Sequence, residues 1–150
     1  MKIGILGSGI VGETLANGFL KHGYEVMRGS RDPLKIADWK AKAGKAASTG
    51  TFEQAAKFGD IVVLSVKGTA AESVIELCGP SSLDGKTVID TCNPIADLPP
   101  VNSVLSFFTG INESLLERLQ KKRPKANFVK AFSCVGNAFM VNPDFGKSNP

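Results

Sequence analysis

The chain has 150 residues and a formal net charge of +4; 43% of its residues are hydrophobic and 21% are charged. This composition is ordinary for a globular domain, and it excludes a disordered tail, a collagen and a coiled coil. The length predicts a single domain over residues 1–150, with no room for a separate substrate-binding domain.

No membrane partner is expected, because the longest strongly apolar run, residues 61–64, is far shorter than the ~20 residues that cross a bilayer. The apolar start at residues 2–6 is too short for a signal peptide. Three cysteines, an odd number without metal-ligand spacing, indicate reduced thiols in a cytoplasmic protein. No nucleic-acid partner is expected either, because aromatic residues are not interleaved with the basic ones.

Short apolar runs alternate with helical patterns along the chain. Strands are predicted at residues 2–6, 24–28, 46–48, 61–66, 86–91 and 127–132. Helices are predicted at residues 10–21, 32–44, 51–58, 69–78 and 114–122. This alternation predicts an α/β fold, with a doubly wound and mainly parallel sheet of the Rossmann type in three α/β/α layers.

Three of the predicted helices begin at recognisable caps. Asp32 precedes a proline and accepts backbone N–H groups as an N-cap. Thr51 with Gln54, and Thr69 with Glu72, have the spacing of capping boxes.

The first predicted strand runs directly into a G-x-G-x-x-G motif, and an amphipathic helix follows. Gly7 allows a tight turn, Gly9 lets the backbone approach a pyrophosphate, and Gly12 lets helix and sheet pack closely. The N–H groups at the helix N-terminus then favour an anion. The alternative is a structural turn without a ligand, but the strand–turn–helix context favours dinucleotide binding. The residues predicted to hold the cofactor here are Gly7, Ser8, Gly9, Ile10, Val11 and Gly12.

The end of the second predicted strand decides between NAD and NADP. NAD sites place a carboxylate there to bind the ribose hydroxyls. This chain has Ser30 and Arg31, with Lys35 one helical turn later. A hydroxyl and a guanidinium suit a 2′-phosphate, which favours NADP(H). Asp32 is the competing ribose ligand, although its role as a helix N-cap explains it without a ligand.

Several segments, taken in order, resemble the NADP-dependent oxidoreductases typified by coenzyme F420:NADP reductase. They are residues 7–12, Gly29-Ser30-Arg31-Asp32-Pro33, Asp90-Thr91-Cys92-Asn93-Pro94 and Lys130-Ala131-Phe132. The resemblance covers nearly the whole chain, and the cytosolic-type domain of membrane ferric reductases shares much of the pattern. It implies a hydride exchange between NADPH and a deazaflavin such as coenzyme F420, a flavin or another small-molecule redox acceptor.

The resemblance also implies roles for individual residues. Ser30, Arg31 and Lys35 would hold the 2′-phosphate. The implied contacts to the pyrophosphate, the nicotinamide ribose and the nicotinamide are Ser65, Val66, Lys67, Asn93, Pro94, Ala131 and Ser133. Family members usually continue past a segment like Asn142-Pro143 with another strand and helix. This chain stops at Pro150, so by this resemblance it is either a truncated form or a form in which the family's last elements are absent.

No catalytic residue and no metal ligand is predicted. Hydride transfer needs donor and acceptor about 3–3.5 Å apart and water excluded, but no general acid. The only histidine, His22, falls at a predicted helix end, so neither a Ser/His/Asp set nor a histidine-rich metal site can be assembled. The sole tyrosine, Tyr24, lies in the second predicted strand, which disfavours a Tyr–Lys proton donor.

Two features keep alternatives open. Cys92 and Cys134 follow predicted strands, and they form either a redox pair or simply small apolar residues. Residues 95–111 show little regular pattern, and loops of this length are usually functional or disordered. Phe107 and Phe108 in this loop either stack on a planar acceptor, contact a partner subunit, or pack the loop onto the core.

Two other functions compete with the oxidoreductase hypothesis. A regulatory module that senses NADP(H) without catalysis fits the short C-terminus and the lack of a substrate domain. An imine or hydroxy-acid reductase would need an appended helical domain that 150 residues cannot supply. An exposed phenylalanine-rich loop would support a homodimer.

Overall fold

The computed structural model describes residues 1–146. The end of the chain at Pro150, to which the expectation about the family's last elements refers, lies outside the described residues. Six strands are present: β1 (Lys2–Leu6), β2 (Glu25–Gly29), β3 (Ala47–Gly50), β4 (Ile61–Leu64), β5 (Thr87–Asp90) and β6 (Asn127–Lys130). They form one sheet in the order β3-β2-β1-β4-β5-β6, and every neighbouring pair is parallel. The predicted doubly wound sheet is confirmed. Its order reverses between β1 and β4, the point at which such sheets bind ligands.

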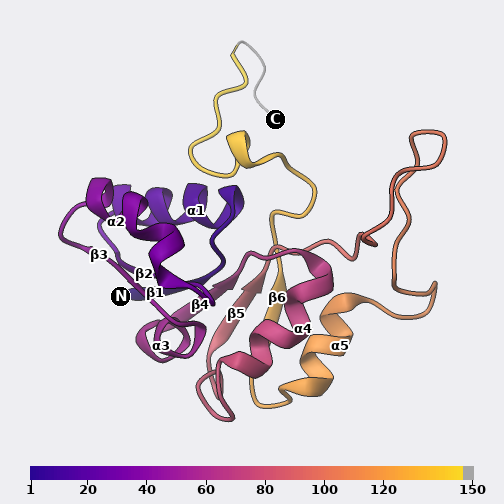
Figure 1. The fold of residues 1–150 in the computed structure, drawn as a ribbon, viewed down its shortest axis with the longest axis horizontal. Helices are drawn as coiled ribbons and strands as arrows, with labels where there is room; N and C mark the ends of the chain where they lie inside the picture. The colour runs from indigo at the N-terminus through magenta and orange to yellow at the C-terminus, as the bar shows by residue number, and fades with distance from the viewer. Residues whose placement is uncertain (147–150) are drawn as a thin grey trace.

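Helices cover both faces of the sheet. They are α1 (Ile10–Lys21), α2 (Ala37–Ala43), α3 (Phe52–Phe58), α4 (Gly68–Leu77) and α5 (Leu115–Lys122), with short 3-10 turns η1 (Pro33–Ile36) and η2 (Asn137–Phe139). Figure 1 shows α1 and α2 on one face and α3, α4 and α5 on the other. Within residues 1–146, no helix is both long and apolar enough to cross a bilayer.

The core consists of two apolar layers, one on each side of the sheet. Ile3, Ile5 and Val63 are buried on the side of α1 and α2. Val62 and Leu64 are buried on the side of α3, α4 and α5. Because side chains alternate across a strand and both faces are covered, the central strands are apolar at nearly every position.

Local side-chain caps are present at the starts of η1, α3 and α5, and absent at those of α1, α2 and α4. The capping box at Thr51 is confirmed: its backbone N–H donates to Gln54 Oε1 at 2.8 Å, and its hydroxyl accepts from the Gln54 N–H at 3.2 Å. The predicted box at Thr69 is wrong. Helix α4 begins at Gly68, and the Thr69 hydroxyl donates at 2.9 Å to Asp97, which lies beyond β5. A partner distant in sequence has replaced the local one.

The predicted helix after Asp32 is divided into η1 and α2. The predicted last strand ends early, at Lys130, because Phe132 has a φ of 61° and turns the chain away from the sheet. The segment after it, residues 131–146, crosses back toward α1. There Asn142 Oδ1 lies 3.3 Å from Nε2 of His22, the residue at the C-cap of α1.

Residues 95–111, predicted to lack regular structure, fold back on themselves as an arm. Two isolated antiparallel bridges hold the arm together, Ile95 with Phe107 and Val101 with Val104. The arm projects from the body of the molecule between β5 and α5 (Figure 1). Its tip turns through Asn102, whose φ of 49° lies in the left-handed region.

Candidate functional site

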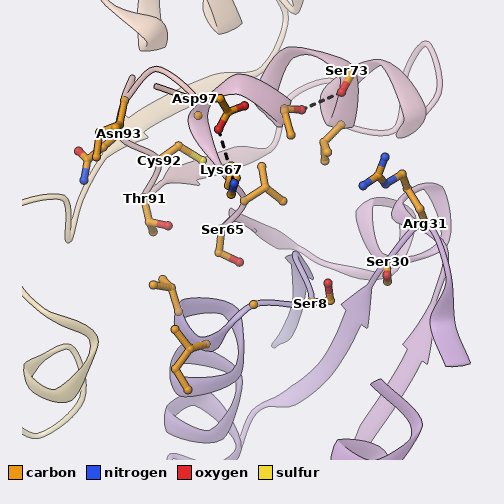
Figure 2. Close-up of a pocket in the computed structure, with 18 of the residues that line it drawn as sticks. Ser8, Ser30, Arg31, Ser65, Lys67, Ser73, Thr91, Cys92, Asn93 and Asp97 are labelled. Atoms are coloured by element: carbon orange, nitrogen blue, oxygen red, sulfur yellow. Dashed lines mark hydrogen bonds and ion pairs between the residues drawn. The ribbon is translucent and has the colours of Figure 1, made fainter. Parts of the chain in front are cut away.

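A cavity of about 1110 Å³ opens at the carboxyl edge of the sheet. Segments that follow β1, β2, β4 and β5 supply most of its lining, as the topology requires. Figure 2 shows Ser30 and Arg31 at one end of the cavity, Asn93 at the opposite end, and Ser65 between them. A cavity of this size and position can take an extended dinucleotide.

The turn after β1 contains glycines of two kinds. Gly7 has a φ of 151°, and a Cβ added to either Gly7 or Gly12 would lie 2.7 Å from the Ser65 hydroxyl oxygen. Packing therefore requires both glycines. Gly9 is different, because its φ is −79° and no atom lies within 4 Å of an added Cβ. Nothing within the described chain requires a glycine there, whereas close approach of a ligand to the backbone would.

Helix α1 presents its N-terminus to the same cavity. Its N-cap, Gly9, makes no side-chain cap hydrogen bond, and Gly9, Ile10 and Val11 all line the cavity. The first N–H groups of a helix have no partner within the helix, and the helix dipole places partial positive charge there. The backbone arrangement that the predicted anion site requires is therefore found at this end of the cavity, while anion binding itself stays a prediction.

Arg28, a residue that the sequence interpretation missed, lies beneath this turn. Its guanidinium is fully buried in β2, donates to the Gly9 carbonyl and to Glu13 at 3.3 Å each, and lies 4.8 Å from the Trp39 ring centroid. Burial lowers the pKa of the Arg28 guanidinium, and the charge of Glu13 opposes that shift. An arginine within a mainly apolar predicted strand was the signal that could have identified it.

The segment after β2, up to and including η1, carries two cations without ion-pair partners among the described residues. Arg31 and Lys35 line the cavity, and no carboxylate within residues 1–146 pairs with either. Asp32 lines it too, but its Oδ1 accepts the Leu34 N–H at 3.1 Å as the N-cap of η1. The Ser30 hydroxyl in turn accepts the Asp32 N–H at 3.2 Å. The predicted capping role of Asp32 is confirmed, which leaves a net positive corner.

The loop after β4 forms the middle of the cavity. The Ser65 hydroxyl donates to the Leu6 carbonyl at 3.2 Å and so joins the ends of β4 and β1. Lys67 extends into solvent and pairs with Asp97 at the base of the arm at 3.5 Å. Since both side chains of this pair are well exposed, it contributes little to stability.

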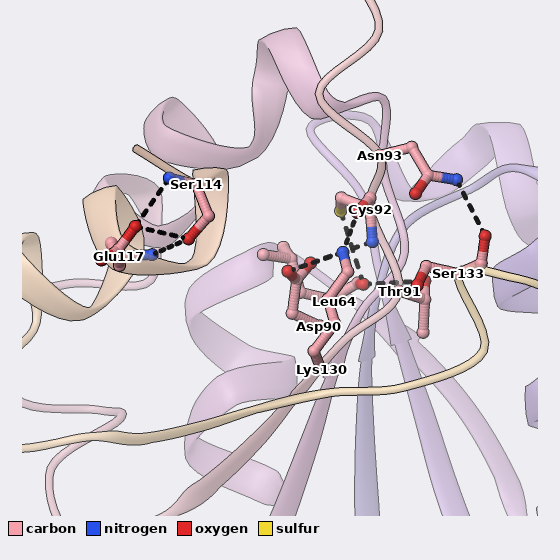
Figure 3. Close-up of polar contacts among 9 residues, drawn as sticks. All are labelled: Leu64, Asp90, Thr91, Cys92, Asn93, Ser114, Glu117, Lys130 and Ser133. Atoms are coloured by element: carbon pink, nitrogen blue, oxygen red, sulfur yellow. Dashed lines mark hydrogen bonds and ion pairs between the residues drawn. The ribbon is translucent and has the colours of Figure 1, made fainter. Parts of the chain in front are cut away.

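The loop after β5 closes the far end (Figure 3). The buried carboxylate of Asp90 accepts from the Cys92 N–H at 2.9 Å and from the Lys130 ammonium at 3.0 Å, and that ammonium also donates to the Cys92 carbonyl. Asn93 lines the cavity, and its amide donates to the Ser133 carbonyl at 3.4 Å. This network fixes the backbone on which Asn93 stands.

Eleven of the fifteen residues predicted to bind cofactor line the cavity. Gly7 and Gly12 lie behind the turn, and Pro94 and Ala131 lie outside the lining. The lining residues that sequence reasoning missed come from α3, α4 and the base of the arm: Phe52, Gly68, Ala70, Ser73, Val74, Ile95, Ala96, Asp97 and Leu98. No motif marks them, because ordinary apolar periodicity explains the helical ones.

The cysteines do not form a reactive pair. Cys92 lines the cavity but is 2% exposed, and burial raises the pKa of its thiol to about 12. Cys134 is exposed, and no disulfide joins any cysteines in the described chain. Because the thiolate is the reactive form, Cys92 behaves as a small apolar residue.

The two arm phenylalanines also lie away from the cavity. Phe108 packs against the core, with the Arg118 guanidinium 5.6 Å from its ring centroid. Phe107 is 60% exposed. Neither lines the cavity, so of the three interpretations packing onto the core fits Phe108.

Comparison with known proteins agrees with this geometry. A family model described as NADP oxidoreductase coenzyme F420-dependent matches residues 2–94, well over half of the chain. The matched stretch holds β1 to β5 and the cavity segments that follow them, up to Pro94.

Among curated proteins, the chain is 29% identical over 106 residues to glycerol-3-phosphate dehydrogenase (NAD(P)+) of Geobacter metallireducens. The match covers 63% of this chain and 32% of that protein, so the chain spans about a third of the length of this curated relative.

Two solved structures illustrate the range of structural similarity. A candidate F420-dependent NADP-reductase from Arthrobacter sp. FB24 superimposes with a TM-score of 0.88 at 27% identity, covering 95% of this chain and 67% of that one. An imine reductase from Streptomyces aurantiacus gives a TM-score of 0.62 at 19% identity, covering 87% of this chain and 40% of that one. The second likeness concerns the fold alone.

Proposed function

The chain belongs to the family of coenzyme F420-dependent NADP oxidoreductases, and we propose that it transfers a hydride between NADPH and a deazaflavin, a flavin or another small redox acceptor. The family is one of NAD(P)-dependent oxidoreductases. The observation that carries the proposal is the pair of unpartnered cations, Arg31 and Lys35, beside the uncapped N-terminus of α1.

The residues of the cavity support the proposal at the phosphate groups and at the adenine of NADPH. The open space at Gly9 and the first N–H groups of α1 suit the pyrophosphate, while Arg31 and Lys35 suit the 2′-phosphate. Phe52, Ala70 and Val74 give apolar surface against which an adenine ring can pack.

In this proposal no side chain acts as a general acid or base. When bound, NADPH supplies the hydride. Asn93 stands at the end of the cavity opposite Arg31, where the Asp90–Lys130 network holds its backbone still. In this proposal the chain's part is to orient the cofactor there, because hydride transfer requires donor and acceptor to be held close together.

Calorimetric titration with NADPH and NADH tests the cofactor assignment. We expect NADPH to bind more tightly, and Arg31→Ala to weaken NADPH binding by about 2 kcal/mol with little change for NADH, because the substitution removes a charge-assisted bond to the phosphate. Lys45→Ala, which removes an exposed cation outside the cavity, is the matched control. Equal losses for both cofactors with Arg31→Ala would contradict an NADP preference.

Loss of NADPH absorbance with coenzyme F420, FMN or FAD present tests the reaction. Turnover with one of these acceptors supports the oxidoreductase and identifies its acceptor class. Tight NADPH binding without turnover on any of them would favour the competing hypothesis, an NADP(H) sensor without catalysis.

The exposed apolar side chains of the arm support a further proposal, that the protein is a homodimer. Leu98, Val101 and Val104 are each more than 60% exposed, and they lie on a segment that projects from the body. Contiguous exposed apolar side chains are typical of contact surfaces.

A further inference from the structure

Arg28 differs from every other cation near the cavity because it is wholly buried. It lies within β2, on the side of the sheet that α1 and α2 cover, and its exposed fraction is 0%. Burying a guanidinium is unfavourable unless its charge and its N–H groups are satisfied. The contacts of Arg28 therefore indicate what the buried charge does.

Those contacts satisfy Arg28 only in part. Glu13 is its single carboxylate partner within residues 1–146; the Glu13 side chain is 44% exposed, and its Oε2 lies 3.3 Å from Nη1 of Arg28. Nε of Arg28 has no hydrogen-bond partner within the described chain. An apolar residue of similar length would avoid this cost in a core of this kind. Stability of the fold thus gives no reason for an arginine at this position.

The remaining contact of Arg28 reaches the turn after β1. Nη2 donates to the Gly9 carbonyl at 3.3 Å, and the same carbonyl accepts the Glu13 N–H at 3.1 Å. A carbonyl oxygen has two lone pairs, so both bonds can form together. In a trans peptide the C=O and the following N–H point in opposite directions. Holding the Gly9 oxygen inward therefore directs the Ile10 N–H outward, toward the cavity.

Arg28 itself is held in a fixed orientation. Its guanidinium stacks on the Trp39 ring at 4.8 Å, and the Trp39 Nε1–H donates to Asn17 of α1 at 2.8 Å. The stack joins β2, α2 and α1 directly behind the glycine turn. It places a positive charge on the protein side of the turn, opposite the cavity.

We propose that Arg28 is a positioning residue for the pyrophosphate of the dinucleotide: it fixes the Gly9 peptide so that the N-terminus of α1 faces the cavity, and it adds positive potential behind that peptide. The inference rests on the proposed NADPH binding. It assigns Arg28 no contact with the 2′-phosphate, for which Arg31 and Lys35 are suited.

The test compares two ligands that differ at the pyrophosphate. NADPH carries a pyrophosphate and a 2′-phosphate, whereas adenosine 2′-monophosphate carries the 2′-phosphate alone. Both are titrated calorimetrically into the wild type, Arg28→Met and Arg28→Lys. The matched control is Lys86→Met, because Lys86 also donates to backbone carbonyls, those of Ala56 and Gly59, but does not line the cavity.

We expect Arg28→Met to weaken NADPH binding by about tenfold and adenosine 2′-monophosphate binding by less than about twofold. Arg28→Lys, which keeps the charge but not the planar fork, should give an intermediate loss for NADPH alone. Lys86→Met should lower the melting temperature and leave the ratio of the two dissociation constants unchanged.

An equal loss for both ligands, or no loss for NADPH, would overturn the positioning role. If Arg28→Met does not fold, as judged by circular dichroism, the same ratio measured on Arg28→Lys decides. Failure of the wild type to bind NADPH would instead refute the proposed function. The two failures are therefore distinguishable.

Discussion

Residues 2–94 and residues 95–146 are built in different ways. In the first region, short loops connect strands and helices whose apolar side chains are nearly all buried. In the second, ten of the fourteen exposed large apolar side chains of the described chain are found. The fully buried core residues of the second region are Leu115, Leu119 and Ala126, and partly buried side chains such as Phe108 and Val141 pack against them or against the other core layer.

The two regions also differ in how their surface loops are held in place. In the first region, the cavity loops after β4 and β5 are fixed by buried hydrogen bonds of Ser65 and Asp90. In the second, the arm is held by two isolated bridges and presents its apolar side chains outward. The first region is suited to holding a ligand rigidly, and the second to making contact with another surface.

Thiol labelling should show the largest difference between the regions. Burial raises the pKa of both Cys78 and Cys92 to about 12, so at pH 8 both stay protonated and covered. We expect the exposed Cys134 to react with iodoacetamide on the order of a thousandfold faster. Mass spectrometry of labelled peptides over time measures this, and all three should react alike in denaturant. Equally fast labelling of Cys92 would contradict the buried thiol.

Alanine substitution at two glycines should show the next largest difference. Gly7→Ala forces a Cβ against Ser65 at a φ of 151°, and we expect it to lower the free energy of unfolding by about 3 kcal/mol. Gly110→Ala, at the end of the arm where an added Cβ meets nothing within 4 Å, should change it by less than about 0.5 kcal/mol. Urea denaturation followed by circular dichroism measures both. Similar losses at the two sites would mean that the arm is as tightly packed as the turn.

A charged residue introduced on the arm should weaken the proposed homodimer and leave the fold of the monomer unchanged. Val104→Asp is expected to raise the dissociation constant of the proposed homodimer by at least about tenfold, since it places a carboxylate within the apolar surface. Sedimentation velocity over a range of concentrations measures it. Leu34→Asp, at an even more exposed apolar position of the first region, is the control. A monomeric wild type would refute the homodimer.

The smallest effect is expected where the two regions meet. Asp97→Asn removes the carboxylate that pairs with Lys67 and accepts from Thr69. Because the pair is exposed, the free energy of unfolding should change by less than about 0.5 kcal/mol. NADPH binding should tighten by about twofold, since one negative charge leaves the cavity wall, and the gain should shrink in high salt. Weaker binding would show instead that Asp97 shapes the site.

The sequence predicted best what neighbouring residues determine. The bounds of β1 and α1 agree with the structure, because an apolar strand, a glycine turn and an amphipathic helix follow one another directly. Sequence reasoning missed what distant residues determine. Asp97 accepts a hydrogen bond from Thr69, 28 positions earlier, and Arg28 donates one to the carbonyl of Gly9, 19 positions earlier. The sequence of the arm has no periodic pattern from which its two bridges could be predicted.

The residues of the candidate site that could be predicted are likewise those that neighbouring residues determine. The cavity residues after β1 and β2 belong to motifs with a known chemistry, so they could be identified from their order alone. Ala70, Val74 and Phe52 lie on helices whose apolar spacing is explained equally well by the core, and only the folded sheet edge shows that they also face the cavity.

The position of β1 at the centre of the sheet has a consequence for synthesis. The Lys2 N–H bonds Asp60, 58 residues later, and β1 gains its second neighbour only when β4 has left the ribosome. Until then the nascent chain carries an apolar strand with one open hydrogen-bonding edge. Parallel sheets closed by such distant pairs form slowly. Strand β1 therefore stays open on one edge until β4 has been synthesised, and a chaperone that covers open strand edges would act during that interval.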